Sequence, residues 1–151
     1  MWVLHPVHNT GAPRHCYHNP MARILLVDDD DTVRTVLSIM LEREGHTVVQ
    51  GVNGNDALRQ LRHHTVDLVI TDLVMPEKEG LETIMEVRRT YPQLKVIAMS
   101  GGGTGRSKAY LTMAKSLGAE RVLKKPFTAE DLLKEIKTLL STKPQPHFAA
   151  N

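Results

Sequence analysis

The chain has 151 residues, a formal net charge of +2 and a hydrophobic content of 41%. This length and composition fit one globular domain with a buried core, not a disordered chain. The near-neutral charge gives no support for nucleic-acid binding, and no apolar stretch approaches the roughly 18 residues needed to cross a membrane. The one cysteine, Cys16, excludes an internal disulfide framework and fits a reducing cytoplasm.

Residues 1–21 differ in composition from the rest of the chain. They contain three prolines, no acidic residue and four histidines, His5, His8, His15 and His18. A zinc site built from these histidines and Cys16 is disfavoured because the segment lacks regular ligand spacing. We interpret residues 1–21 as a disordered leader or a misassigned start, and residues 142–151 as a flexible tail. The folded domain is therefore predicted over residues 22–141.

Within that domain, short apolar runs alternate with helical patterns. The predicted strands are 23–27, 47–52, 67–71, 95–99 and 121–123. Continuous apolar runs without alternation are typical of parallel strands that are covered on both faces. Five repeats of a strand followed by a helix predict an α/β fold, a doubly wound parallel sheet with helices on both sides.

The helices between the strands are amphipathic. The first, over residues 32–44, is predicted to bury one stripe: Val33, Val36, Leu37, Met40 and Leu41. The fourth aligns a second stripe: Tyr110, Met113, Ala114 and Leu117. Asp30 or Asp31 is expected to cap the first helix, the pair His63-His64 to end the second, and residues 128–131 to form a capping box for the last.

Polar residues stand at the carboxyl ends of these strands. Asp28 and Asp29 follow the first predicted strand, Asp72 the third, Ser100 the fourth and Lys125 the fifth. Since ligands of open α/β sheets bind outside the carboxyl ends of the strands, we expect these side chains to form one pocket.

Carboxylates placed together must protonate or bind a cation, and an all-oxygen set favours Mg2+. The predicted fold contains no cluster of His and Cys that would favour zinc. Ser100 and Lys125 would face the oxygens of a phosphoryl group, and Asp72 could accept that group as an aspartyl phosphate. A nucleotide-binding P-loop at residues 100–107 is disfavoured, because Ser100 replaces the first glycine and Arg106 replaces the lysine.

Four segments together resemble the receiver domain of two-component response regulators. They are residues 24–30 (ILLVDDD), 72–76 (DLVMP) with Gly80, 99–101 (MSG) and 125–127 (KPF). The resemblance covers residues 22–141 and implies a flavodoxin-like (βα)5 sheet with strand order 2-1-3-4-5.

The resemblance also implies roles for the site residues. Asp72 would be the phosphoacceptor, Asp29, Asp72 and the Val74 carbonyl would bind Mg2+ directly, and Asp28 would act through water. The histidine kinase or phosphotransferase that supplies the phosphoryl group would be the partner.

The resemblance also implies which residues respond to phosphorylation and which are needed for the structure. Ser100 and Lys125 would hold the phosphoryl oxygens, the Lys125–Pro126 bond is expected to be cis, and Gly80 is a structural position. The chain departs from the family at Val122, which stands where receivers commonly carry an aromatic switch residue. It also has Val74, with no polar side chain to position an attacking water, so the phosphate lifetime is open.

The leading hypothesis is a cytoplasmic, stand-alone response regulator, a signalling domain and not an enzyme, that promotes its own phosphorylation and dephosphorylation. Its output would be a target protein docking on the face made by the fourth helix, fifth strand and fifth helix, with the chain a monomer or a weak homodimer. The alternative is a pseudo-receiver, an interaction module independent of phosphorylation. A magnesium-dependent phosphatase is disfavoured because Leu73 and Val74 supply no general acid beside the nucleophile.

Overall fold

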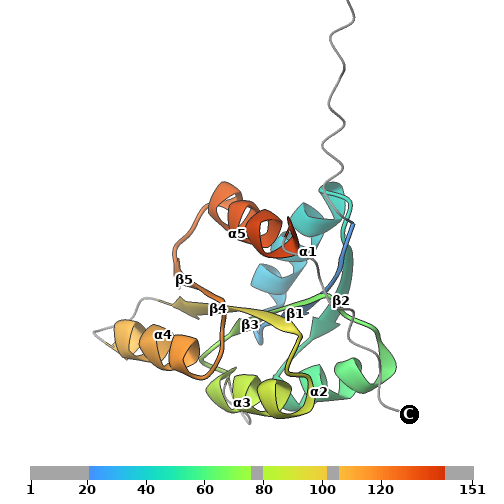
Figure 1. The fold of residues 1–151 in the computed structure, drawn as a ribbon. Coiled ribbons are helices and arrows are strands. Elements are labelled where there is room, and N and C mark those ends of the chain that lie inside the picture. The colour runs from blue at the N-terminus through green and yellow to red at the C-terminus, as the bar shows by residue number, and fades with distance from the viewer. Residues whose placement is uncertain (1–20, 76–79, 102–105, 142–151) are drawn as a thin grey trace, which may run out of the picture.

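The computed structural model describes residues 21–75, 80–101 and 106–141, in which five strands alternate with five helices (Figure 1). In chain order these elements are β1 Arg23–Val27, α1 Asp31–Arg43, β2 Thr47–Gly51, α2 Gly54–His63, β3 Leu68–Asp72, α3 Gly80–Thr90, β4 Lys95–Gly101, α4 Arg106–Ser116, β5 Arg121–Lys125 and α5 Ala129–Ser141. None of these helices is long and apolar enough to span a membrane. The predicted leader up to residue 20 and the tail, 142–151, lie outside the described residues.

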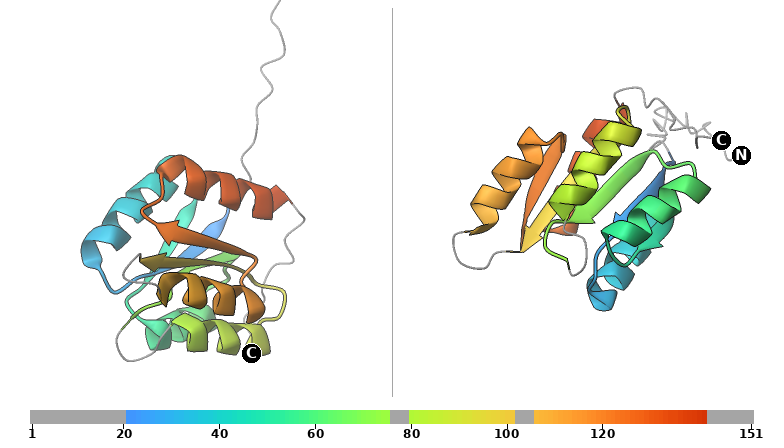
Figure 2. Two further views of the ribbon diagram at one scale, coloured as in Figure 1. Left: turned by 90° about the vertical axis from the view of Figure 1, so that its left-hand side faces the viewer. Right: turned by 90° about the horizontal axis from the view of Figure 1, so that it is seen from below.

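The strands form one parallel sheet in the order β2-β1-β3-β4-β5, as predicted. Helices α1 and α5 cover one face, and α2, α3 and α4 cover the other (Figure 2). In a parallel sheet whose strands are joined by helical crossovers, all carboxyl ends of the strands lie at one edge and all amino ends at the opposite edge. The edge that carries the carboxyl ends therefore gathers residues that lie far apart in the sequence.

Two apolar cores, one on each face, hold the layers together. Leu25, Val27 and Val69 pack toward α2, α3 and α4, whereas Ile24, Leu26 and Ile70 pack toward α1 and α5. Every residue of β3 is buried. Burial on both faces is the reason that the strands appear in the sequence as continuous apolar runs.

The predicted helix caps are present. The Asp30 carboxylate accepts hydrogen bonds from the amides of Thr32 (2.9 Å) and Val33 (3.2 Å) at the start of α1. At α5 the Thr128 hydroxyl accepts from the Asp131 amide (3.1 Å), and the Asp131 carboxylate accepts from the Thr128 amide (3.0 Å). These bonds satisfy amides that a helix leaves unpaired at its start.

Two features of the predicted helices and strands are corrected. Val36 on α1 and Met113 on α4 were expected in buried stripes, but they are 59% and 51% exposed. On α1 the buried positions are instead Arg34, Leu37, Ser38 and Leu41, a stripe rotated away from Val36. Two strands run further than predicted: Ser100 lies inside β4 and Lys125 ends β5, because the backbone hydrogen bonding continues past the apolar run. By contrast, β2 ends one residue earlier than predicted, at Gly51, and β3 is shifted by one residue to 68–72.

Candidate functional site

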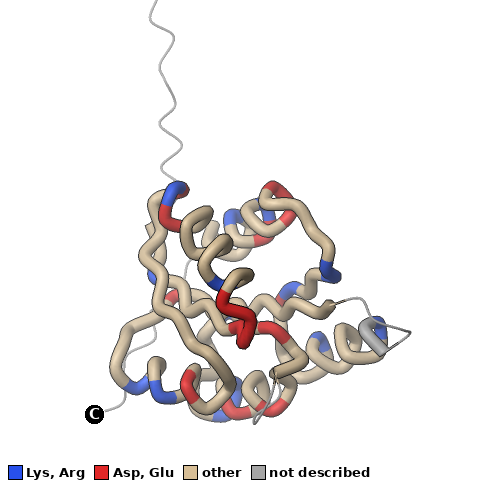
Figure 3. Tube along the Cα trace, turned by 180° about the vertical axis from the view of Figure 1, so that it is seen from behind, with Lys and Arg blue, Asp and Glu red and all other residues tan. Residues whose placement is uncertain are grey.

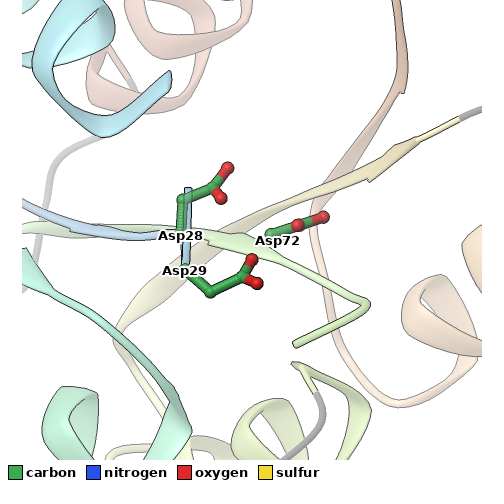
Figure 4. Close-up of side chains that lie close together, drawn as sticks. All are labelled: Asp28, Asp29 and Asp72. Carbon is green, nitrogen blue, oxygen red and sulfur yellow. The ribbon is translucent and has the colours of Figure 1, made fainter. Parts of the chain in front are cut away.

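Three carboxylates gather at the carboxyl edge of the sheet. Asp28 follows β1, Asp72 is the last residue of β3, and both are buried, whereas Asp29 is exposed. One oxygen from each lies within 4.8 Å of the others. Figure 4 shows the three side chains extending toward the same region, and Figure 3 shows the acidic run 28–31 as a red turn at this edge. The predicted convergence of Asp28, Asp29 and Asp72 is therefore present.

The ammonium group of Lys125 is the cation closest to this cluster among the ion pairs of the described residues. Its Nζ lies 3.1 Å from Asp28 Oδ2 and 3.7 Å from Asp72 Oδ2. Lys125 and Asp28 are 97 positions apart in the sequence. Lys125 thus offsets part of the negative charge but not the charge of three carboxylates.

Backbone amides hold the remaining oxygens of the two buried carboxylates. The Asp30 amide donates to Asp28 Oδ1 and the Leu73 amide to Asp72 Oδ1, each at 2.9 Å. Asp28 therefore has both oxygens engaged, one by an amide and one by Lys125. Asp72 keeps Oδ2 directed toward Lys125 at a distance longer than a hydrogen bond.

The surroundings of Asp72 raise the pKa of its carboxyl from 3.8 to about 6. Burial is the main cause, and the charges of Asp28 and Asp29 add to it, while Lys125 and the Leu73 amide act in the opposite direction. An ionised Asp72 is thus less stable in the folded chain than an ordinary exposed carboxylate, although it is still the major form at neutral pH, and added positive charge would stabilise it. This is the behaviour expected of a carboxylate that shares a cation with its neighbours.

Ser100 supplies a buried hydroxyl at the same edge. It is 1% exposed, and its Oγ has no hydrogen-bond partner in the described part of the chain. It follows Met99, which pairs with Asp72 in the sheet register. A buried polar atom without a partner costs about 1 to 3 kcal/mol, and a phosphoryl oxygen at the pocket would satisfy it.

The donor set fits Mg2+. The groups that converge are carboxylate oxygens, which this hard cation prefers, and it keeps several waters while using one or two carboxylates. The exposed Asp29 and the Oδ2 of Asp72 are available, whereas both oxygens of Asp28 already accept hydrogen bonds. That difference supports an outer role for Asp28 through water. Ligation by the Val74 carbonyl stays a prediction.

Two structural positions of the predicted site have clear surroundings. The Gly80 amide donates to the Leu73 carbonyl at 2.9 Å, and a Cβ on Gly80 would lie 2.2 Å from the Asp72 carbonyl oxygen. Only glycine allows α3 to begin this close to the end of β3. The Lys125–Pro126 peptide bond is cis, as the resemblance implied.

The region around Val122 contains open space. A hollow of about 400 Å3 lies between α4 and β5, and its lining residues are Lys108, Leu111, Thr112, Lys115, Ser116 and Val122. Val122 pairs with Ala98 in the sheet and is half-buried. The position predicted as the altered switch thus borders an open surface hollow between α4 and β5.

One residue near the site was missed in the sequence. Arg34 on α1 is 9% exposed and donates from Nη1 to the Asp28 carbonyl at 2.7 Å. The helical pattern offered a signal, because Arg34 stands three and seven positions before the buried Leu37 and Leu41. A charged residue on a buried stripe, directly after an acidic turn, indicates a partner inside the protein.

The family model of the response regulator receiver domain matches residues 24–137. The chain belongs to this family. Solved structures agree: a response regulator receiver domain protein from Clostridium thermocellum superposes with a TM-score of 0.75 at 30% identity, covering 82% of this chain and 97% of that one. The chemotaxis response regulator CheY4 of Vibrio cholerae gives a TM-score of 0.70 at 30% identity, covering 79% and 98%.

The curated relatives of this receiver are longer proteins. It is 35% identical over 127 residues to the DNA-binding transcriptional regulator NtrC of Azospirillum brasilense, which covers 83% of this chain and 25% of that protein. It is also 35% identical over 120 residues to the transcriptional regulatory protein CpxR of Escherichia coli K12; this match covers 80% of this chain and 50% of CpxR. The receiver thus spans half or less of the length of these relatives.

Proposed function

We propose that this receiver accepts a phosphoryl group on Asp72 from a histidine kinase or a phosphotransferase, in a reaction that needs Mg2+. The observation that carries the proposal is the buried Asp72 carboxylate with Asp28, Asp29 and Lys125 around it at the open edge of the sheet. Phosphoryl transfer needs charge stabilisation and positioning more than covalent machinery, and the carboxylates and Lys125 at this edge are groups that could hold a cation and the phosphoryl oxygens.

The contacts favour one oxygen of Asp72 as the nucleophile. Oδ1 of Asp72 accepts the Leu73 amide, so Oδ2 is the oxygen left to attack phosphorus. The Oδ2–P bond forms as the P–N bond of a phosphohistidine breaks, and the departing imidazole nitrogen keeps the electron pair and takes a proton from water. Bound Mg2+ would neutralise the phosphoryl oxygens. Lys125 would then turn from Asp28 to a phosphoryl oxygen, and the Ser100 hydroxyl would donate to another.

The alternative, a pseudo-receiver, is less well supported by the same geometry. An interaction module gains nothing from a buried carboxylate whose pKa is raised to about 6 beside two more carboxylates. Such an arrangement costs stability unless a cation or a phosphoryl group uses it. The unpartnered Ser100 hydroxyl supports the same conclusion.

Labelling with a small phosphodonor such as acetyl phosphate tests the proposal. The wild-type protein is expected to take up label in Mg2+ and to take up none when a chelator is present from the start, whereas Asp72→Asn takes up none in either condition. Asp67→Asn is the matched control, since Asp67 lies at the other end of β3, where its carboxylate accepts from the Arg23 amide. Equal labelling of wild type and Asp72→Asn, or none in either, would contradict the proposal and favour the pseudo-receiver.

Val74 is expected to lengthen the life of the phosphate. Its apolar side chain is exposed two residues after Asp72 and cannot orient a water for attack on phosphorus. Val74→Asn should shorten the half-life of the labelled protein about tenfold, since an amide can position that water. Decay of label after removal of the donor measures this, with Val74→Ala as the apolar control. Equal half-lives for the two variants would contradict the role given to position 74.

The output of the receiver is also part of the proposal. We expect phosphorylation to change the surface formed by α4, β5 and α5, so that a target protein binds there. Stand-alone action in the cytoplasm, without nucleic-acid binding and as a monomer or weak homodimer, stays a prediction. The chain covers 98% of CheY4, so one of its structural neighbours is a response regulator little longer than the matched domain. The chain covers only 25% of NtrC and 50% of CpxR, which are named as transcriptional regulators, so an output through transcription stays open.

A further inference from the structure

Arg34 makes an unusual set of contacts for a residue of a surface helix. Besides its bond to the Asp28 carbonyl, its Nε donates to Gln50 Oε1 at 3.0 Å and its Nη2 pairs with the Asp31 carboxylate. The guanidinium thus joins α1, the end of β1 and the edge strand β2. A buried charge is kept only where such partners surround it.

The Asp28 carbonyl belongs to the peptide unit that also contains the Asp29 amide. A peptide unit is planar, so a bond that holds its oxygen also orients its nitrogen and the next Cα. The Asp28 amide is held separately, by the Gly51 carbonyl at 3.2 Å. The two bonds secure the backbone on either side of Asp28 and thereby the direction in which Asp29 leaves the turn.

The exposed Asp29 side chain has no such hydrogen bond within the described part of the chain, whereas Asp28 and Asp72 are each held by a backbone amide. The geometry of the three-carboxylate cluster therefore depends on the backbone at 28–29. Arg34 supplies that backbone contact without occupying a carboxylate oxygen of the cluster. Its guanidinium donates to the Asp28 carbonyl, to the side-chain oxygen of Gln50 and to the Asp31 carboxylate, which is not part of the cluster.

We propose that Arg34 is a positioning residue for the magnesium site: it orients the Asp28–Asp29 peptide so that Asp29 can bind the cation, and Gln50 holds the guanidinium in place. The inference rests on the proposed function insofar as the cluster binds Mg2+. Lysine cannot replace arginine here, because one ammonium group cannot donate in the three directions that the planar fork serves.

The test measures Mg2+ affinity by titration calorimetry, together with thermal unfolding in the absence of Mg2+. Arg34→Lys is expected to raise the Kd for Mg2+ at least about tenfold, as loss of an outer contact to a metal ligand does. Arg88→Lys is the matched control. Arg88 also clamps backbone carbonyls, those of Gly118, Pro92 and Leu94, but it does so outside the site. Both variants should unfold at lower temperature, and only Arg34→Lys should bind Mg2+ more weakly.

A second variant covers the case in which Arg34→Lys does not fold. Gln50→Ala changes an exposed residue of β2 and should raise the Kd by a few fold, because the guanidinium loses one of its partners. In the Arg34→Lys background the same change should have no further effect. An unchanged Kd in Arg34→Lys, or in Gln50→Ala where the first variant does not fold, would overturn the inference. So would an equal loss of affinity in Arg88→Lys. Failure of the wild-type protein to bind Mg2+ would instead overturn the proposed function and the inference with it.

Discussion

Gly80→Ala is expected to lower the free energy of unfolding by more than about 3 kcal/mol. An added Cβ would lie 2.2 Å from the Asp72 carbonyl oxygen and 2.6 Å from Leu73 Cα, and both are backbone atoms that cannot rotate away. Alanine is otherwise the better helix former by about 1 kcal/mol, so the sign of the effect separates the clash from helix propensity. Urea unfolding monitored by circular dichroism measures it.

Gly101→Ala is the matched control for that experiment. Gly101 ends β4 at the same edge of the sheet, and a Cβ there would meet nothing within 4 Å. The free energy of unfolding of Gly101→Ala should stay within about 1 kcal/mol of that of the wild type. If Gly80→Ala were as stable as Gly101→Ala, α3 could not approach the end of β3 as closely as described. The placement of Leu73 and Asp72 would then also be wrong.

Asp72→Asn is expected to stabilise the metal-free protein at pH 8 by about 1 to 3 kcal/mol. The pKa of Asp72 is raised to about 6, chiefly by burial, so the folded state binds a proton more tightly than the unfolded state. The contribution of this group is therefore fully present below pH 4 and is lost as the pH rises through 6. Asparagine has no proton to lose, so the advantage of the variant should appear between pH 4 and 6 and persist above.

Saturating Mg2+ should cancel or reverse the stability advantage of Asp72→Asn. Binding to the folded state alone stabilises the wild type by about 2.7 kcal/mol at a hundredfold excess over the Kd, whereas Asp72→Asn lacks one of the carboxylates. Asp131→Asn is a control of opposite sign, because the Thr128 amide and hydroxyl lower the pKa of this capping carboxyl. Unfolding curves at pH 4, 6 and 8, with and without Mg2+, measure the effect. A metal-free Asp72→Asn that is less stable than the wild type at pH 8 would contradict the electrostatic account.

Much of the fold follows from periodicity. The unbroken apolar run before Asp28 and the one before Asp72 predict strands buried on both faces, and the sheet confirms them. Once the strands are parallel, their carboxyl ends meet at one edge, which is why Lys125 could be predicted beside Asp28 across 97 positions. Capping by Asp30 followed from local hydrogen-bonding chemistry in the same way.

Other features depend on tertiary contacts that no short pattern contains. The exposure of Val36 follows from how α1 rotates against the sheet, and that rotation also buries Arg34. The length of β4 is set by backbone pairing with β5, which continues through Ser100 and Gly101 whatever their polarity. Position 80 needs glycine because the start of α3 lies against the backbone of Asp72 and Leu73. The sequence therefore indicated Gly80 as a structural position but not the contact that requires glycine there.

Reductive trapping tests most directly whether Asp72 is the phosphoacceptor. The protein is incubated with Mg2+ and acetyl phosphate, treated with borohydride, which converts an acyl phosphate to an alcohol, and mapped by peptide mass spectrometry. Reduction is expected at Asp72, dependent on Mg2+, and none is expected at Asp28 or Asp29, which are proposed to bind the cation. Reduction at Asp28 or Asp29 instead, or no reduced residue at all, would contradict the assignment of Asp72 as the phosphoacceptor.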